Sequence, residues 1–251
     1  MSEDEIMVKI TFLGTGGTPG VPWRAQMGIL IEAEGLVYLF DVGGHIERRL
    51  IEYELRASDI NGIFITHTHF DHVGGLPSLL TLMISEGYSR RVEVYGPPEI
   101  ESVIMNMVRS LGPRESLKFI QVRPLENNTT MIVKPFKITS FEVRHTVKAY
   151  GYEIEVEDVK VVYTGDTKPY ENVKKHSKNA KLVIHEASFP DWMEEAAEIT
   201  CHSTIGQAIY ESQDAEMIAL VHITRYSQEQ IVKGPLPPKV IVPSDLTVIK
   251  I

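Results

Sequence analysis

The sequence contains a single cysteine, Cys201, among its 251 residues. One cysteine cannot form an intramolecular disulfide, and such a low content is typical of proteins from a reducing compartment, so we expect a cytoplasmic protein. Long apolar runs are also missing, and none approaches the roughly 18 residues that a membrane-spanning helix needs. We therefore expect no membrane partner. We expect Cys201 to be a small buried residue rather than a metal ligand.

Basic residues are scarce as well. The chain has 25 Lys and Arg against 34 Asp and Glu, which gives a formal net charge of −9. Non-specific binding of nucleic acid depends on neutralisation of phosphates by Lys and Arg, so the composition argues against it. A local basic patch is not excluded. The candidates are 89–91 and 174–178, although such runs more often form a solvated face.

The most informative segment of the chain is Thr66–His72, which has the sequence T-H-T-H-F-D-H and follows a short apolar run. Residues two apart in an extended segment point to the same side, so His67 and His69 can reach one metal ion together. Asp71 and His72 lie at the start of the next predicted helix and can face a second metal ion. Imidazole and carboxylate donors suit zinc best. We predict a metal site here; the alternatives are a histidine-rich solvated loop and a buried polar network.

Three more candidate ligands follow strand-like runs later in the chain: His145, Asp166 and His222. Each could be an ordinary loop residue if it stood alone. A dinuclear hydrolase site needs a further histidine for the first metal, a carboxylate that bridges the metals, and a last histidine for the second metal. The three residues occur in that order, so the whole set predicts a two-metal hydrolase.

At these positions the sequence resembles the metallo-β-lactamase-fold hydrolases, and within them the ribonuclease Z (tRNase Z) family. The resemblance runs from Phe12 to about Tyr226. It also rests on the strings G-T-G-G, T-G-D-T, H-E-A-S, H-S-T and H-I-T-R-Y, which begin at Gly14, Thr164, His185, His202 and His222. The resemblance implies an α/β fold of the α+β type, a four-layer αββα sandwich. We expect one domain over 1–251, with 1–5 as a flexible tail.

The resemblance implies a ligand set for two Zn²⁺ per chain, with Mn²⁺ or iron as alternatives. The first zinc would be held by His67, His69 and His145. The second would be held by Asp71, His72 and His222, and Asp166 would bridge the two ions. A homodimer is usual in the family, so we expect one here.

The resemblance also implies catalytic roles. Asp71 would orient the attacking water, and Glu186 with His202 would form an acid pair in which His202 protonates the leaving oxygen. A histidine suits this task near neutral pH, and a neighbouring carboxylate raises its pKa. Arg225 and Arg24 would contact the substrate phosphate. Structural roles remain as alternatives, a helix-capping neighbour for His202 and a surface ion pair for Arg225.

Two departures from the family pattern bear on the substrate. Many family members have a long flexible arm between the third histidine and the bridging aspartate, whereas twenty residues separate His145 from Asp166 here. The family also expects Arg-Asn in the N-terminal loop, where this chain has 23–26, Trp-Arg-Ala-Gln. The predicted substrate is therefore a tRNA precursor or a small phosphodiester such as a cyclic nucleotide. A thioester or lactone hydrolase and a catalytically silent RNA-binding subunit are further alternatives.

Asp41 has two interpretations. It can accept a hydrogen bond from the second ring nitrogen of a metal-binding imidazole, or it can cap the following helix.

The hydrophobic pattern of the sequence also predicts the positions of the strands and helices. Strands are expected at 6–13, 28–33, 37–41, 62–66, 92–96, 118–122, 131–143, 149–156, 159–164, 182–185, 217–221 and 246–249. Helices are expected at 46–55, 74–86, 100–111, 203–212 and 228–233, with Ser203 as an N-cap.

Overall fold

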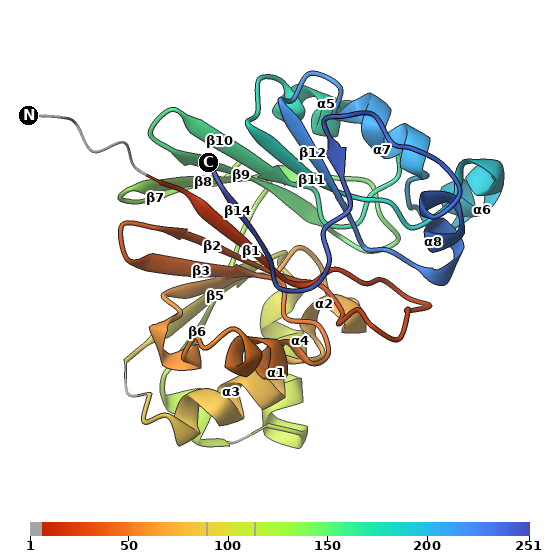
Figure 1. The fold of residues 1–251 in the computed structure, drawn as a ribbon. Coiled ribbons are helices and arrows are strands. Elements are labelled where there is room, and N and C mark those ends of the chain that lie inside the picture. Colours follow the sequence, from red (N-terminus) through yellow and green to blue (C-terminus); the bar gives the residue numbers. More distant parts are fainter. Residues whose placement is uncertain (1–6, 89, 113) are drawn as a thin grey trace, which may run out of the picture.

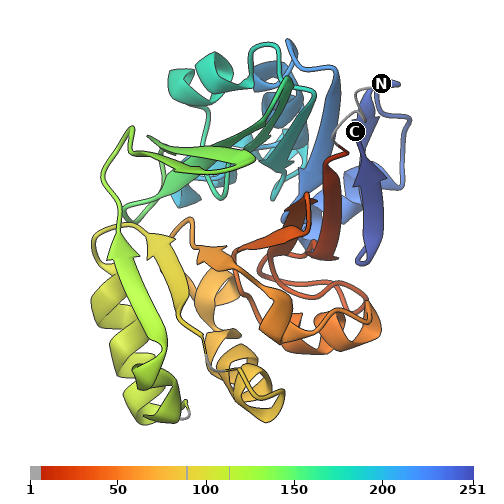
Figure 2. The same ribbon diagram turned by 90° about the vertical axis from the view of Figure 1, so that its left-hand side faces the viewer.

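The computed structural model describes residues 7–88, 90–112 and 114–251. The expected tail at 1–5, and Ser89 of the first basic run, lie outside these residues. Two seven-stranded sheets face each other and helices cover their outer faces (Figure 1). The view turned by 90° shows the same layers from the side (Figure 2). The expected four-layer αββα sandwich is therefore confirmed.

The strand order of each sheet follows from hydrogen bonding between neighbours. The first sheet has the order β14 (Thr247–Lys250), β1 (Lys9–Gly14), β2 (Gly28–Ala33), β3 (Leu36–Phe40), β4 (Gly62–Phe64), β5 (Val92–Gly96) and β6 (Ile120–Pro124). The second has the order β13 (Val240–Ile241), β12 (Met217–Val221), β11 (Leu182–Glu186), β10 (Val159–Tyr163), β9 (Tyr150–Val156), β8 (Phe136–Glu142) and β7 (Thr130–Val133).

The helices fall into two groups that follow the two sheets. Those of the first half are α1 (Ile46–Glu52), α2 (Phe70–Val73), α3 (Leu76–Ser85) and α4 (Ile100–Ser110). Those of the second half are α5 (Glu171–Ser177), α6 (Glu194–Thr200), α7 (Ile205–Glu211) and α8 (Arg225–Ile231). Short 3₁₀ turns occur at Ala57–Asp59, Arg114–Lys118 and Asp191–Met193. No helix of the described residues is long and apolar enough to cross a membrane.

Strand direction brings the loops of interest to one edge of each sheet. β3, β4, β5 and β6 run parallel, so their carboxyl ends share an edge. β10, β11 and β12 are also parallel to one another. β8 runs the same way as β10, because both pair antiparallel with β9. Residues that follow these strands are therefore neighbours in space, although they are far apart in sequence.

Apolar side chains between the sheets form one of the two main clusters of the core. Aromatic rings dominate it: Phe64 stacks on Phe40 with ring centroids 5.0 Å apart and on Tyr95 at 4.8 Å, and Tyr152 meets Phe64 edge-on at 5.4 Å. A second apolar cluster lies between the first sheet and α1, α3 and α4. It includes the predicted helical stripe of Leu76, Leu79, Leu80 and Met83, and all four side chains are fully buried.

Several predicted elements need correction. The single strand expected at 131–143 is a hairpin, β7 and β8, with Pro135 in its turn, because proline cannot donate a hydrogen bond within a sheet. The helix expected at 74–86 begins at Leu76 and follows a separate short helix, α2. α7 begins after Thr204 rather than after Ser203. Thr204 accepts a hydrogen bond from the backbone N–H of Gln207 and forms a capping box with it.

Candidate functional site

The histidine block lies in the loop from β4 to α2 and in α2 itself. His69 is the N-cap of α2 with an extended backbone, and the backbone N–H groups of His72 and Val73 donate to its carbonyl. Two hydrogen bonds tie the loop to the second sheet. The Tyr150 N–H donates to the Thr66 carbonyl at 3.0 Å, and the Tyr152 hydroxyl donates to the Ile65 carbonyl at 2.7 Å. These bonds fix the loop between the two halves of the molecule.

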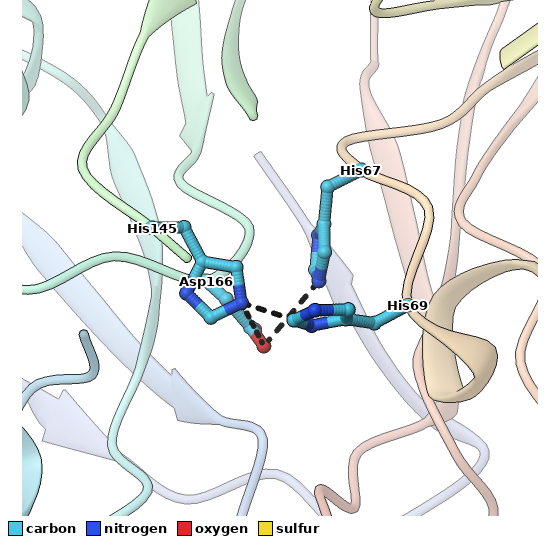
Figure 3. A group of neighbouring side chains, drawn as sticks. All are labelled: His67, His69, His145 and Asp166. Carbon is cyan, nitrogen blue, oxygen red and sulfur yellow. Dashed lines mark hydrogen bonds and ion pairs between the residues drawn. The ribbon is translucent and has the colours of Figure 1, made fainter. Parts of the chain in front are cut away.

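One group of candidate ligands contains His67, His69, His145 and Asp166, whose ligand atoms all lie within 4.8 Å of one another. Figure 3 shows the side chains pointing toward a common centre. His145 Nε2 lies 3.0 Å from His69 Nδ1, and Asp166 Oδ2 lies 3.7 Å from His67 Nε2. The loop after β4 supplies two of these residues, and the loops after β8 and β10 supply the others.

A second group contains Asp71, His72 and His222, and it shares Asp166 with the first. His222 Nε2 lies 3.3 Å from Asp71 Oδ2 and 3.3 Å from Asp166 Oδ2. His72 Nε2 lies 3.2 Å from Asp166 Oδ1. Both oxygens of Asp166 therefore face histidines, and this carboxylate stands where the two groups meet.

The donor atoms of this cluster fit a divalent metal ion. His67 Nε2, His72 Nε2 and Asp166 Oδ1 are buried and make no well-aligned hydrogen bond among the described residues, although the last two lie 3.2 Å apart. A buried polar atom without a partner costs about 1–3 kcal/mol, so three that converge on one place require an explanation. Imidazole nitrogen and carboxylate oxygen are donors that divalent transition metals accept. Coordination would satisfy all three atoms.

The second ring nitrogens of the candidate ligands are held by the protein. Asp41 Oδ2 accepts from His72 Nδ1 at 2.8 Å and from the Tyr163 hydroxyl at 2.7 Å, and Asp41 Oδ1 accepts from the Thr66 N–H at 2.8 Å. Ser188 Oγ lies 2.7 Å from His222 Nδ1. Of its two interpretations, Asp41 therefore takes the first, since its carboxylate orients an imidazole.

Cys201 differs from the expectation. Its side chain is half-buried, and its backbone is left-handed, with φ of 56°, at the end of α6. The Cys201 carbonyl accepts a hydrogen bond from His145 Nδ1 at 2.9 Å. The prediction of a buried packing residue is therefore wrong. Cys201 contacts the site through its backbone carbonyl, and the residue type gives no indication of such a contact.

Electrostatics separates the histidines of the cluster. Burial lowers the pKa of His67 well below its ordinary value, which favours the neutral form that binds metal. Burial alone would also lower the pKa of His72, but the carboxylates of Asp166 and Asp41 outweigh it and raise that pKa. For Asp71, the tendency of burial to raise the pKa is outweighed by the hydrogen bond from His222, which lowers it.

Glu186 and His202 form a hydrogen-bonded pair at the end of β11. His202 Nδ1 donates to Glu186 Oε1 at 2.8 Å, and the Thr167 N–H donates to the same oxygen at 2.9 Å. Glu186 Oε2 accepts from the Ser188 hydroxyl at 2.6 Å. Burial would lower the pKa of His202, but the nearby Glu186 carboxylate outweighs it and raises that pKa to about 9. The Glu186 carboxylate therefore favours the protonated form of His202, which lies next to the cluster.

The cluster opens to solvent through a cavity of about 420 Å³. Its lining comprises Thr18, Gln26, His69, Phe70, Asp71, Asp166, His202 and His222. The cavity thus brings together side chains from both groups of candidate ligands and His202. A substrate that enters it can contact all three.

Comparisons with known proteins place the chain in a family. A family model described as the anti-Pycsar protein Apyc1 matches residues 8–233. A ribonuclease Z from Pyrococcus abyssi is 30% identical, and the match covers 95% of this chain and 94% of that protein. The chain belongs to this family of ribonuclease Z and Apyc1 proteins. A ribonuclease Z from Methanocaldococcus jannaschii is 28% identical over 90% of this chain and 89% of its own.

Solved structures agree with this family. Human tRNase Z, short form, superposes with a TM-score of 0.78 at 25% identity and covers 96% of this chain and 98% of its own. YhfI from Bacillus subtilis, a metallo-β-lactamase fold protein, gives a TM-score of 0.81 at 20% identity over 97% and 99% of the two chains, which shows the fold alone. The protein is a metal-dependent hydrolase of the metallo-β-lactamase fold.

This family member is shorter than its relatives inside the matched region. The match to the Pyrococcus abyssi ribonuclease Z runs over 293 aligned positions, more than the 251 residues of this chain, so that relative has insertions which this chain lacks. Between His145 and Asp166 the chain makes only β9, a turn at Glu157 and Asp158, and β10. The family arm discussed above has no counterpart in this segment.

The two arginines expected to contact phosphate lie outside the lining of the cavity. Arg24 Nη1 donates to Thr15 Oγ1 and to the Pro243 carbonyl, each at 2.6 Å, so its guanidinium already binds the protein. Arg225 is exposed at the start of α8, and its Nη2 donates to the Tyr226 hydroxyl at 3.2 Å. Tyr226 stacks on Phe189, whose ring centroid lies 6.1 Å from that of His202. Arg225 is therefore on the His202 side of the site.

Two residues that sequence analysis did not single out complete the site. Ser188 links the Glu186–His202 pair to the second group of candidate ligands, because its Oγ contacts both Glu186 and His222. Tyr163 connects the second sheet to Asp41 of the first. Ser188 belongs to the string H-E-A-S, so a signal for it was present. Nothing in the sequence around Tyr163 distinguishes it from a core aromatic.

Proposed function

We propose that this protein is a two-zinc phosphodiesterase that cleaves precursor tRNA on the 3′ side of the mature sequence. The observation that supports this most directly is the Glu186–His202 pair, which stands beside two groups of metal-binding side chains that share Asp166. Metal charge and a proton donor for the leaving oxygen each accelerate the cleavage of an unactivated phosphodiester. The ribonuclease Z relatives are named for cleavage of RNA, and their substrate comes to this chain as a proposal.

We assign each zinc ion to one of the two groups. The first is assigned to His67, His69 and His145, and the second to Asp71, His72 and His222, with Asp166 between them. When bound, the two ions supply positive charge that stabilises the phosphate in the transition state, and they lower the pKa of water. Zinc suits this set of imidazoles and carboxylates better than a hard cation does.

The protein's own residues supply the proton chemistry. Asp71 lines the cavity, and its carboxylate can accept a hydrogen bond from the attacking water. His202 uses Nδ1 to donate to Glu186, so its Nε2 is left to donate a proton to the leaving oxygen. The Ser188 hydroxyl and the Thr167 N–H hold Glu186 in place. Glu186 thereby keeps His202 protonated and oriented.

A small phosphodiester is the second candidate substrate. Its support is the direct β9–β10 hairpin, which leaves no arm in that segment to bind the body of a tRNA, and the net charge of −9. Both candidates use the same metal site and the same acid, so they differ only in what lies beyond the scissile phosphate.

The first experiment is cleavage of a precursor tRNA with a 3′ extension by the zinc-loaded protein, with the cut mapped to one nucleotide. Asp71→Ala is the control. A metal-dependent cut just past the discriminator base supports tRNA processing. No cut, together with hydrolysis of a simple diester in the same buffer, would indicate that the substrate is a small diester.

Metal content per chain, measured by mass spectrometry, tests the assignment of two zinc ions against manganese or iron. Light scattering tests the expected homodimer.

A further inference from the structure

Phe70 occupies an unusual place beside the metal cluster. It lies between His69 and Asp71 in sequence, and its side chain is 68% exposed. A single exposed aromatic residue is common on protein surfaces and by itself indicates nothing. Phe70 differs because it lines two cavities at once, the cavity of the metal cluster and a neighbouring one of about 410 Å³. The Phe70 side chain therefore contributes to the lining of both cavities.

The ring of Phe70 packs against the backbone of its own helix. A Cβ atom placed on Gly74, one turn later, would lie 2.6 Å from Cε2 and 2.8 Å from Cδ2 of the ring. The ring therefore packs directly on the Cα of Gly74, and any side chain at that position would displace it. An exposed aromatic ring that packs on the backbone beneath it offers a stacking surface for a ligand, and the packing reduces the conformational entropy lost on binding.

Gln26 also lines both cavities and supplies a polar group beside the ring. Its Oε1 accepts a hydrogen bond from the Gly44 N–H at 2.8 Å, which fixes the side-chain amide. Its Nε2 has no partner in the part of the chain that the structure describes, so this donor is left for a ligand. Proteins recognise an unstacked nucleobase with an aromatic face and a hydrogen bond to the edge of the base.

A third cavity of about 300 Å³ continues from the second, since Arg24 and His45 line both. Arg48 and Arg49 also line it. Arg49 is engaged by Glu52 at 2.5 Å and by Asp245 at 3.0 Å. Arg48 is 74% exposed and pairs with Glu52 across the helix surface. Such exposed ion pairs contribute little to stability, so the pair with Glu52 is a weak competitor for a phosphate at Arg48.

We infer that the three cavities form one groove that binds the nucleotide next to the scissile phosphate. The base lies against Phe70 and Gln26, and the next phosphate lies at His45 and Arg48. This inference rests on the proposed phosphodiesterase function and makes the substrate a nucleotide diester rather than a simple one. Every base presents an aromatic face, so stacking at Phe70 requires a base without selecting which one.

The base-binding part is tested with diuridine monophosphate and two analogues, one without the 5′ base and one without the 3′ base. The wild-type protein should hydrolyse diuridine about tenfold more efficiently in kcat/KM than one of the two analogues, as expected for one stacked base. In Phe70→Leu this ratio should fall close to one. Trp192→Leu, which changes another exposed aromatic residue outside the groove lining, should keep the ratio. Metal content is measured in both variants.

The outcomes separate this inference from the proposed function. Hydrolysis of all three compounds at equal rates by the wild-type protein overturns base binding and leaves the phosphodiesterase standing. A tenfold ratio that survives in Phe70→Leu also overturns it. Failure to hydrolyse any of the three, with full metal content, contradicts the phosphodiesterase function itself.

The phosphate-binding part is tested by adding a terminal phosphate on the side of the recognised base. The wild-type protein should show a severalfold lower KM for the phosphorylated dinucleotide, and this gain should shrink with added salt. Arg48→Gln should remove the gain. Arg109→Gln, an exposed arginine on α4, should keep it. The absence of a gain in the wild-type protein, or its persistence in Arg48→Gln, would overturn the assignment of this end of the groove.

Discussion

The two halves of the molecule contribute to the metal cluster in different ways. The first sheet supplies four candidate ligands within six residues of one loop and helix, from His67 to His72. The second sheet supplies His145, Asp166 and His222, each from a different strand end. In the first half, the local backbone sets the geometry. In the second half, the register of several strands sets it. The ligands from the first half are therefore close together in sequence, whereas those from the second half are far apart in sequence and only the fold brings them together.

Hydrogen bonds that cross between the sheets join these two kinds of construction. The Tyr150 N–H and the Tyr152 hydroxyl, both from β9, bind the loop after β4. Tyr163 of β10 binds Asp41, which in turn orients His72. The local ligand block is therefore positioned relative to the non-local ligands by the tyrosines of the second sheet. Removal of a ligand at the meeting point should have the largest effect.

Asp166→Ala should cause the largest loss, because the Asp166 carboxylate faces both groups. We expect metal content to fall by at least half and diester hydrolysis to become undetectable. Mass spectrometry of the purified protein and an assay with a nitrophenyl diester measure the two effects. Asp158→Ala, an exposed aspartate in the β9–β10 turn, is the matched control and should keep both. Full metal content in Asp166→Ala would contradict the assignment of Asp166 as the shared ligand.

His202→Ala should separate acid catalysis from metal binding. We expect metal content to stay unchanged and kcat to fall by about 10²–10⁴-fold for a substrate with an alkoxide leaving group. The loss should be smaller for a nitrophenolate leaving group, which needs no proton. Equal losses for the two leaving groups would remove His202 from the acid role.

Glu186→Gln sharpens the same point through pH. The Glu186 carboxylate is the main group that raises the pKa of His202 to about 9, so its neutralisation should lower that pKa. His202 is then deprotonated at lower pH. The alkaline decline of kcat should therefore begin at lower pH in the variant than in the wild-type protein. An unchanged pH profile would show that another group limits the rate.

How far the sequence predicts this site depends on the same contrast. The four-layer architecture was implied by the resemblance to a known family, whereas the pattern of strands and the block from His67 to His72 follow from local periodicity and spacing. The role of Asp41 does not, because its partners His72 and Tyr163 lie far along the chain and only the fold brings them to it. Cys201 was misjudged for a related reason, since its carbonyl, not its thiol, contacts His145. The sequence encodes such contacts only through the packing of the whole sandwich.

Asp41→Asn tests the support that the first half gives to its own ligands. An amide keeps the shape of the carboxylate but loses the charge that orients the His72 imidazole. We expect metal affinity to fall by about 10–100-fold, as for other residues that hydrogen-bond to a metal ligand without touching the metal. Competition with a zinc chelator measures the change. Affinity equal to that of the wild-type protein would mean that helix α2 positions His72 without help from Asp41.

The smallest effect is expected in the second half, at the start of α7. Thr204 caps this helix, and its side chain accepts from the Gln207 N–H while the Gln207 side chain accepts from the Thr204 N–H. Thr204→Ala should lower the free energy of unfolding by about 1 kcal/mol, as measured by urea denaturation. Thr204→Ser, which keeps the hydroxyl, is the control. Because Thr204 lies two residues from His202, a loosened cap should also disturb the acid more than the metal ligands. A drop in kcat with normal metal content in Thr204→Ala would show that the position of His202 depends on the cap of α7 as well as on the register of the strands.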